Sequence, residues 1–565
     1  MGQTIPFFAG VGSVTTVREM LRDLIAGAIE RAQQQGVLPP VAVPEVTVET
    51  PQNADHGDYA SNIALRMART ARMDPMSIAL TLANQMAGTH FLSSVEVARP
   101  GFLNFKLSPA WIASQVDDIL SQGASFGSVP MGNGATVQIE YVSANPTGPL
   151  HVGAGRGAAL GDSLANILSH AGYQVQREYY INDAGSRMEA FYTTLYSRYL
   201  QQLGLEADLP ADGYAGEYMV DLAREIVSAH GRRYLDMPRE EALPRIGKLG
   251  TDMMVARIRA DLERMNVRFD RWFSEQSLYD EGLIESTIQK LRDRGYVTEG
   301  EGAVWFASTS LGEDKDNVLV RSNGTPTYFA SDAAYHYDKF VLRGFDKVID
   351  VWGADHQGHV PRMKNIAAGI GVDPERLIVI LYQLVSLKRG GKPVRMSKRT
   401  GDIITLDEVL EEVGPDAVRF FLLARSPEAM MDFDLDLAKE QSNENPVYYV
   451  QYAHARIASI LRYAGDVDFA DGDVSLLTSQ PEQELIRKML MLPELVEIAA
   501  ANLAPHHLPH YAQEIAAVFH SFYKQCRVVS EDEALTKARL KLVSACKVVL
   551  GNTLGLMGVN APEQM

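Results

Sequence analysis

The apolar residues near the N-terminus follow first a helical and then a strand period. Leu21, Ile25 and Ile29 recur at helical spacing, and VAVPEVTVET, residues 41–50, alternates as a strand does. NADHGDYASNIAL then predicts a turn leading into a helix, and GFLNFKLS predicts a further strand. This mixture predicts a small α+β domain over residues 1–125, followed by MGNGAT as a linker.

Residues 126–405 alternate between strand and helix patterns. TVQIEYVSA has the strand period, a loop of glycines and prolines follows it, and apolar residues from Leu160 to Leu168 then share one helical face. QVQREYYI completes a βαβ unit, and KVIDVWGAD and LIVILYQLVSL predict further buried strands. We therefore expect an α/β fold with a doubly wound parallel sheet and a helix-rich insertion at about residues 190–300.

The last region, residues 406–565, is predicted to be an all-α bundle. Ile515, Val518, Phe519 and Phe522 have the spacing of one helical face. Prolines and a turn-rich acidic stretch separate the helical segments.

Composition excludes several classes of protein. No run is long and apolar enough to span a bilayer, and the N-terminus lacks the basic start and apolar core of a signal peptide. Cys526 and Cys546 cannot form a tetrahedral zinc site by themselves and suggest a reducing compartment. We expect a cytoplasmic protein with no membrane partner. The net charge of −18 argues against a coat of nucleic acid, but it permits local basic patches.

One histidine, His151, lies in SANPTGPLHVGAGRGAALGD, a loop of small residues that leaves a strand and opens a helix. Unpaired backbone N–H groups and the helix dipole bind anions at such a junction. Gly153, Gly155 and Gly157 carry no side chain that would block a ligand. An imidazole there can donate to a phosphate oxygen as charge develops. The alternative is a tight turn that His151 only caps.

A second candidate segment, LKRGGKPVRMSKRTGD, begins at Leu387 and has no acidic residue before Asp402. In an acidic chain, the plain interpretation of such a basic run is a solvated loop. The other interpretation is a loop that closes over a triphosphate, where its lysines offset the charge of departing pyrophosphate.

These two segments resemble a known pair. PLHVG, followed about 245 residues later by MSKR, is similar to the HIGH and KMSKS signatures of class I aminoacyl-tRNA synthetases. IEYVSANPTGPLHVG, EYYINDAG, GADHQGHVPRMK and GPDAVRFFLL resemble, in this order, the arginyl-tRNA synthetase family, and NADHGDYASNIA and GFLNF resemble its additional N-terminal domain. The resemblance covers essentially the whole chain.

The resemblance implies an arginine–tRNA ligase. Arginine attacks the α-phosphate of ATP, and the arginyl group then passes to the 3′ end of tRNA(Arg). The family needs Mg²⁺ with the ATP, and it generally activates arginine only when the tRNA is present. A monomer is its usual state, and we expect no zinc.

The resemblance also assigns roles to individual residues. His151 would stabilise the α-phosphate and Lys398 would bind the β- and γ-phosphates. The expected ATP-binding residues are His151, Gly153, Ala154, Arg395, Met396, Ser397 and Lys398. The expected arginine-binding residues are Glu140, Ser143, Asn145, Tyr328, Asp332 and Gln357, with Asp183 as a further pocket candidate.

The chemistry of the substrate agrees with these residue types. A guanidinium group favours planar contacts with carboxylates, and Tyr328 and Asp332 share one face if their segment is helical. Ser143 and Asn145 follow the first strand, where open α/β sheets bind ligands. The plainer interpretations are a turn for Ser143 and Asn145, and a surface carboxylate for Asp332.

Two residues depart from the family signatures. Arg395 replaces the first lysine of KMSKS and keeps its charge, whereas Ala154 replaces the second histidine of HIGH. Loss of one donor to a developing charge costs on the order of 10²–10³ in rate. Another group compensates, or the chain activates slowly, or the position has been altered.

The C-terminal helices resemble the family's anticodon-binding bundle. Tyr448, Tyr452 and Arg456 offer rings and a cation that can stack on unpaired bases, although tyrosines at helical spacing more often belong to a core. Met565 and Asn104 are further expected tRNA contacts, with Asn104 reading a base of the tRNA elbow or serving only its strand.

Other classes remain as alternatives. A catalytically impaired, synthetase-like tRNA-binding protein has only Ala154 in its favour, and Tyr328 and Asp332 argue against a glutamate-specific synthetase. A nucleotidyltransferase acting on small molecules would not use two terminal domains. MDFDLDL lacks the glycine and closing glutamate of a calcium loop, and PHHLPH has no fourth ligand nearby, so we predict no metal site.

Overall fold

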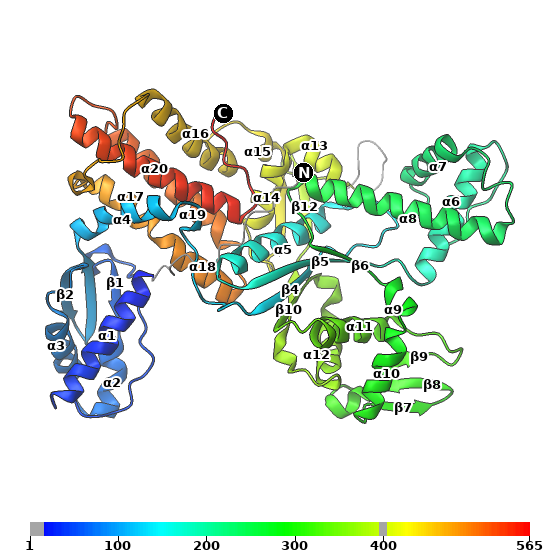
Figure 1. Cartoon of the computed structure of the whole chain (residues 1–565), viewed down its shortest axis with the longest axis horizontal. Coiled ribbons are helices and arrows are strands. Elements are labelled where there is room, and N and C mark those ends of the chain that lie inside the picture. The colour runs from blue at the N-terminus through cyan, green and yellow to red at the C-terminus, as the bar shows by residue number, and fades with distance from the viewer. Residues whose placement is uncertain (1–15, 395–403) are drawn as a thin grey trace.

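The N-terminal domain packs helices against a small antiparallel sheet. The computed structural model describes residues 16–394 and 404–565, and this domain lies at the lower left of Figure 1. Its sheet has the order β1-β3-β2. The elements are α1 (Val17–Gln34), β1 (Tyr59–Ser61), α2 (Ile63–Ala71), α3 (Pro75–Met86), β2 (Leu92–Ala98) and β3 (Phe102–Leu107). The α+β character that the sequence predicts is confirmed.

Residues 41–50 do not form the predicted strand. Within them, only Glu49 pairs, in an isolated antiparallel bridge with Ala60. Pro44 lacks the N–H group that a sheet ladder requires, so the alternation of this stretch does not lead to pairing. The strand beside β3 is instead β1, which lies in the stretch that predicts a turn before a helix.

A parallel sheet of five strands lies at the centre of the molecule (Figure 1). Its order is β11-β10-β4-β5-β6, so the chain runs outward from β4 to β6 and then returns to the other side of β4. Ligands bind where the direction of such a sheet reverses, at the carboxyl ends of the strands. The strands are β4 (Thr136–Tyr141), β5 (Gln174–Ile181), β6 (Arg271–Ser274), β10 (Lys347–Gly353) and β11 (Leu377–Tyr382). The predicted doubly wound sheet is confirmed.

The first helix of this core, α5 (Val152–His170), packs directly on the sheet. Gly161 lies against the ring of Tyr141 on β4, where any side chain would collide with the ring. A Cβ at Gly157 would come within 3.0 Å of the Tyr382 hydroxyl. The glycines in the middle of α5 therefore allow close packing of helix on sheet.

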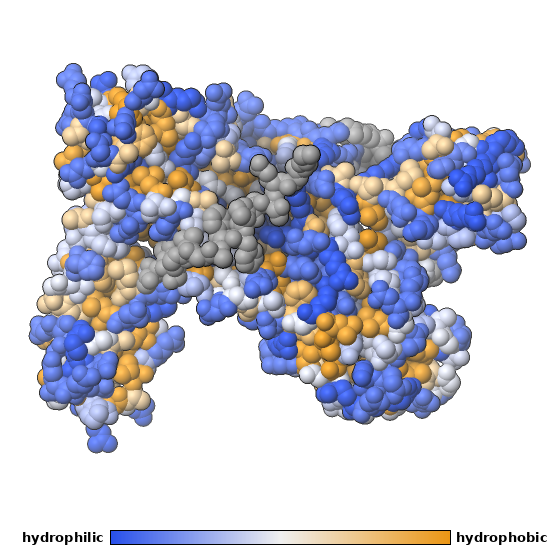
Figure 2. Space-filling view, viewed as in Figure 1, coloured by the Kyte–Doolittle hydropathy of each residue, from blue (hydrophilic) through white to orange (hydrophobic). Residues whose placement is uncertain are grey.

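Three helices form an insertion with a core of its own. They are α6 (Ser186–Gln202), α7 (Glu217–His230) and α8 (Arg239–Arg264). The insertion projects to the right in Figure 1, and Figure 2 shows hydrophilic residues over most of its visible face. The expected stretch 190–300 is mostly helical, but it also contains β6, an edge strand of the central sheet. A four-residue strand that opens with Arg271 is too short to show a period.

The chain between β6 and β11 builds a second apolar core on the sheet. Its π-helical turn, η4, continues α11 directly. The elements are α9 (Gln276–Asp280), α10 (Leu283–Asp293), β7 (Val297–Gly300), β8 (Ala303–Phe306), η3 (Ser308–Leu311), β9 (Asn317–Val320), α11 (Tyr328–Tyr337), η4 (Asp338–Leu342), η5 (Ala354–His359), α12 (Val360–Gly369) and η6 (Pro374–Arg376).

The C-terminal region is helical except for one strand. β14 (Met431–Asp434) pairs in parallel with β12 (Val385–Arg389), so the C-terminal region is not wholly helical. The stretch LIVILYQLVSL, predicted as one strand, contains β11 and the start of β12. Asp434 caps a helix and Asp432 pairs with Lys388, which explains the acidic MDFDLDL stretch. The remaining elements of the described residues are η1 (Ala54–His56), α4 (Pro109–Gln122), η2 (Gly123–Ser125), β13 (Lys392–Pro393), α13 (Leu406–Val413), α14 (Pro415–Leu423), α15 (Leu435–Lys439), α16 (Pro446–Ala464), η7 (Val474–Leu476), α17 (Gln480–Met489), α18 (Met491–Asn502), α19 (His507–Gln525) and α20 (Glu533–Leu556).

Charged side chains join the N-terminal domain to the C-terminal bundle. The Tyr59 hydroxyl donates to Glu494 at 2.8 Å, and Arg18 contacts the same carboxylate at 2.8 Å. Arg487 donates to Asp58 at 2.7 Å. None of the helices in the described ranges has the length and apolarity needed to cross a membrane.

Candidate active site

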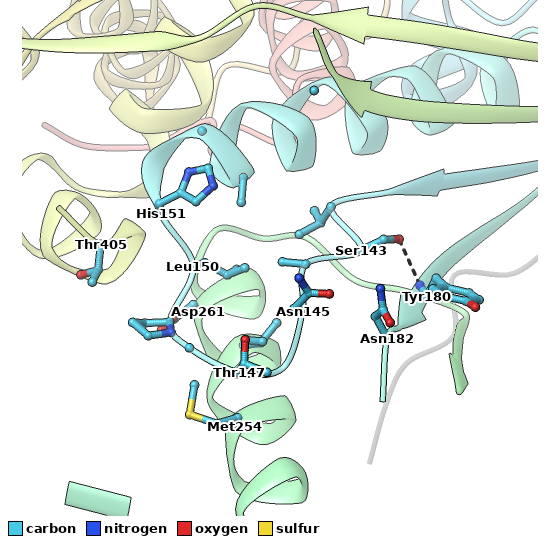
Figure 3. A pocket seen from close by; sticks show the side chains of 18 of the residues that line it. Ser143, Asn145, Thr147, Leu150, His151, Tyr180, Asn182, Met254, Asp261 and Thr405 are labelled. Carbon is cyan, nitrogen blue, oxygen red and sulfur yellow. Dashed lines mark hydrogen bonds between the residues drawn. The ribbon is translucent and has the colours of Figure 1, made fainter. Parts of the chain in front are cut away.

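A large cavity opens at the carboxyl ends of the central strands. Its volume is about 2070 Å³, and it is bounded by the loop after β4, by α8 of the insertion, by α11 and by the start of α13. Figure 3 shows part of its lining, with His151 and Asn145 on the loop and Asp261 on α8. Drug-sized ligands occupy sites of roughly 300–1,000 Å³, so this cavity is larger than one such ligand requires.

His151 stands at the N-cap position of α5, where it faces the cavity. Its side chain makes no capping hydrogen bond, so the ring does not serve the turn. A Cβ at Gly153 would lie 2.7 Å from the ring, and this explains the glycine. Partial burial lowers the pKa of His151, against an opposing effect of Asp355, so the imidazole is neutral near pH 7 and offers one N–H donor.

The other two glycines, Gly155 and Gly157, lie within α5 and do not line the cavity. Gly155 packs against the side chain of Leu406, and Gly157 packs against Tyr382. The expectation that all three glycines admit a ligand is therefore wrong for these two. Ala154 lines the cavity from the first turn of α5 and is 4% exposed.

Glu140 and Ser143 form one end of the cavity. Ser143 Oγ donates to Glu140 Oε1 at 2.9 Å and accepts from the backbone N–H of Tyr180 at 3.1 Å (Figure 3). Val142 and Ser143 have φ values of 70° and 40°, a region that branched side chains rarely adopt. Such strain at a strand end is found at ligand sites, and here it turns Ser143 between two strands.

Two carboxylates from different elements converge on the same cavity. Asp332 lies one turn after Tyr328 on α11, and Glu275 follows β6. Burial raises the pKa of Glu275 to about 7 and that of Asp332 to about 6. Within the described ranges, Glu275 Oε2 has no hydrogen-bond partner. Two carboxylates that are largely withdrawn from water and face one cavity suit a cationic ligand with several N–H donors.

Sequence reasoning missed Glu275. The four-residue strand before it shows no period, so nothing marked Glu275 as the first residue beyond a strand of a parallel sheet. The available signal was local: a carboxylate two residues after the apolar pair Trp272 and Phe273.

The predicted site residues divide into three groups. The structure brings eight of them into the one cavity: Glu140, Ser143, Asn145, His151, Gly153, Ala154, Tyr328 and Asp332. Gln357 is exposed on η5 and does not line it, and Asp183 accepts from Ser274 and from the N–H of Gln276, so it ties β5 to α9. The remaining four lie outside the described residues: Arg395, Met396, Ser397 and Lys398.

The aromatic residues of α16 form a stack with an arginine. The rings of Tyr448 and Tyr452 are parallel, with centroids 6.2 Å apart. Arg456 lies 4.9 Å from the ring centroid of Tyr452 and 5.0 Å from that of Tyr523, and it donates to the Tyr452 hydroxyl. All four are at least partly exposed, so these tyrosines are not core residues.

Two further predicted tRNA contacts lie in the terminal domains. Asn104 is in β3, opposite Ala60 and Glu96, and is 8% exposed. Met565 ends the chain and is 54% exposed.

Three family models match successive parts of the chain. Residues 19–107 match the arginyl tRNA synthetase N terminal domain, residues 115–456 the catalytic domain of class I (R) tRNA synthetases, and residues 450–565 the DALR anticodon binding domain. An arginine–tRNA ligase of Dehalococcoides mccartyi strain CBDB1 is 53% identical over 98% of this chain and 100% of its own length. One of Carboxydothermus hydrogenoformans is 50% identical, over 96% of this chain and 98% of its own.

Solved structures agree with the sequence relatives. A putative arginyl-tRNA synthetase of Campylobacter jejuni has a TM-score of 0.75 at 34% identity, over 81% of this chain and 100% of its own. The arginyl-tRNA synthetase of Thermus thermophilus has a TM-score of 0.76 at 26% identity, over 97% of this chain and 100% of its own. The family identification made from the sequence is confirmed: the chain belongs to the class I arginyl-tRNA synthetases.

Proposed function

We propose that this chain activates arginine with ATP in the cavity and transfers the arginyl group to the 3′ end of tRNA(Arg). The observation that carries the proposal is the pair of carboxylates, the buried Glu275 and the half-buried Asp332, which face the same cavity as His151. One side of the cavity carries carboxylates, which suit the guanidinium group of arginine. The other side carries the N-terminus of a helix, which suits a triphosphate.

The arginine end has a partner for each substrate group. Asp332 and Glu275 receive the guanidinium group, and the Tyr328 hydroxyl lies on the same side of α11 as Asp332. Glu140 receives the α-ammonium group, and Ser143 and Asn145 orient the carboxylate. Gln357 was predicted for this site from family resemblance alone, and its exposed position on η5 gives that assignment no support.

Activation forms one bond and breaks another. A carboxylate oxygen of arginine attacks the α-phosphorus, and the bond to the bridging oxygen of pyrophosphate breaks. His151 donates an N–H to an α-phosphate oxygen as negative charge builds on it, and the N-terminus of α5 adds its dipole. Mg²⁺ bound to ATP neutralises part of the phosphate charge. Lys398, with Arg395, Met396 and Ser397, is proposed from family resemblance to bind the departing phosphates.

The terminal domains hold the tRNA. Tyr448, Tyr452 and Arg456 form a surface on which unpaired anticodon bases can stack. Asn104 on β3 is proposed to read a base of the tRNA elbow, and Met565 to contact the RNA at the C-terminus. We propose that the protein acts as a monomer in the cytoplasm.

The test is charging of tRNA(Arg) with each of the twenty labelled amino acids. The parent is expected to charge arginine and no other amino acid. Asp332→Asn removes one guanidinium partner and is expected to lose charging, while Asp183→Asn, outside the cavity, keeps it. A parent that binds tRNA(Arg) but charges nothing contradicts the proposal and favours a catalytically impaired tRNA-binding protein, for which Ala154 is the one supporting observation.

A further inference from the structure

A lysine lies fully buried beneath the cavity, and the proposed reaction gives it no task. The side chain of Lys339 has 0% exposure, and it is not among the residues that line the cavity. It belongs to η4, the π-helical turn that continues α11. Such turns are rare and frequently occur at functional sites. Because a buried ammonium group is costly unless paired, its partners show what it stabilises.

Lys339 bridges two carboxylates on neighbouring strands. Glu140 on β4 and Asp350 on β10 are register partners, so their side chains lie side by side. Lys339 Nζ donates to Glu140 Oε2 at 2.6 Å and to Asp350 Oδ1 at 3.0 Å. Burial alone would lower the pKa of Lys339, but Asp350 and Glu140 raise it above its usual value. The ammonium group therefore stays charged and separates two anions that would otherwise repel.

Asp350 extends this arrangement to the guanidinium end of the cavity. Its Oδ2 lies 3.1 Å from His336 Nε2, and His336 Nδ1 lies 2.8 Å from the backbone oxygen of Asp332. Burial opposes ionisation of Asp350, but Lys339 and His336 lower its pKa to about 2. Buried charges thus connect the two ends of the arginine site.

We propose that Lys339 is a positioning residue, which holds the Glu140 carboxylate where it receives the α-ammonium group of arginine. The inference rests on the proposed assignment of Glu140 to that group. Oε1 of Glu140 accepts from Ser143 and Oε2 accepts from Lys339, so the carboxylate has one orientation and keeps lone pairs for the cavity. Lys339 does not touch the substrate and acts through Glu140.

The test compares arginine with an analogue that lacks the group in question. Parent and Lys339→Met are assayed by tRNA-dependent ATP–pyrophosphate exchange, with 5-guanidinopentanoic acid, which is arginine without its amino group, as the competitor. The KM for arginine is expected to rise about ten- to a hundredfold, the effect of a lost charged hydrogen bond. The inhibition constant of the competitor and the KM for ATP are expected to change less than about threefold, since neither ligand needs Glu140.

Arg343 offers a matched control. It follows η4 and pairs with Glu178, with Nη2 2.9 Å from Oε1. Glu178 is fully buried and is the register partner of Glu140 on β5, but it does not line the cavity. Arg343→Met therefore breaks a similar buried pair and is expected to leave the KM for arginine nearly unchanged. Equal rises of the KM for arginine and the inhibition constant in Lys339→Met would show a merely structural role and overturn the inference.

A second variant keeps the test decisive if Lys339→Met does not fold. Lys339→Met/Asp350→Leu removes the ammonium group together with one of its two carboxylate partners, so it leaves one uncompensated buried carboxylate, where Lys339→Met leaves two. Circular dichroism during heating checks its fold, and the same selective rise is expected because Glu140 still loses its ammonium partner. A parent that charges no arginine contradicts the proposed function. A parent that charges arginine, with variants that show no selective rise, contradicts only the role of Lys339.

Discussion

The two ends of the cavity are built in different ways. At the arginine end, the side chains are held by other buried side chains, as Ser143 and Lys339 hold Glu140. At the phosphate end, His151 makes no side-chain hydrogen bond within the described ranges. The other groups offered to an anion there are the backbone N–H groups at the start of α5. A guanidinium group needs fixed charges in fixed places, whereas phosphates bind to any array of N–H groups. Selectivity for the amino acid and the rate of activation should therefore respond to different residues.

The largest expected effect comes from the arginine end. Asp332→Asn keeps the shape of the side chain but removes the charge that faces the guanidinium group. Loss of a buried charged partner typically costs 2–5 kcal/mol, so kcat/KM for arginine should fall by about 10²–10³. The fall in kcat/KM is expected to come from a rise in the KM for arginine, measured by pyrophosphate exchange. A drop confined to kcat would place Asp332 in the chemical step and remove the contrast between the two ends.

The phosphate end should show the opposite division. His151→Ala removes a donor that acts only as charge develops on the α-phosphate. We expect kcat for activation to fall by about 10²-fold while the KM for arginine stays within about threefold. Tritiated-arginine binding at equilibrium provides the control, because ground-state binding should be unaffected.

The pH dependence of arginine binding sharpens the comparison. Burial raises the pKa of Glu275 to about 7 and of Asp332 to about 6, so both carboxyls take up protons as the pH falls through this range. Because both carboxyls must be ionised to bind the guanidinium group, the KM for arginine should fall by about 10²-fold between pH 5.5 and 8. Glu275→Gln should remove the step near pH 7. The KM for ATP in the same series should lack this profile.

The smallest expected effect concerns Ala154. Ala154→His restores the second histidine of the signature at the first turn of α5. We expect kcat for activation to rise severalfold, well below the 10²–10³ that one donor can contribute, with an unchanged KM for arginine. Charging that appears only in the variant would show that the parent chain is impaired.

Some site residues could be predicted because the signal for them is local. His151 lies in a glycine-rich junction between a strand and a helix. Tyr328 and Asp332 were predicted from the family resemblance, and their i, i+4 spacing only agrees with it. The helices at residues 17–34 and 507–525 follow from their apolar period. The stretch 41–50 shows the limit of such patterns, because Pro44 interrupts its ladder without changing the alternation of its side chains.

Other residues could not be predicted because their meaning comes from distant partners. Glu275 is marked only by the short strand before it. Lys339, in a sequence of charged and aromatic residues, gives no sign of burial, although its side chain has 0% exposure. The three-residue strand β1 and the pairing of β14 with β12 likewise depend on the partner strand.

The linear order of residues determined the family, the alternation of strands and helices, and the types of side chain available for the chemistry. These depend on near neighbours, because hydrophobic periods and turn residues act over a few positions. The tertiary structure alone decided which charges are buried together and which of them stay ionised. Lys339 and Glu140 are 199 residues apart in the chain, yet they form a 2.6 Å hydrogen bond in the fold, and there Lys339 opposes the rise that burial causes in the pKa of Glu140. Ionisation depends on burial and on neighbouring charges, and only the folded chain supplies these.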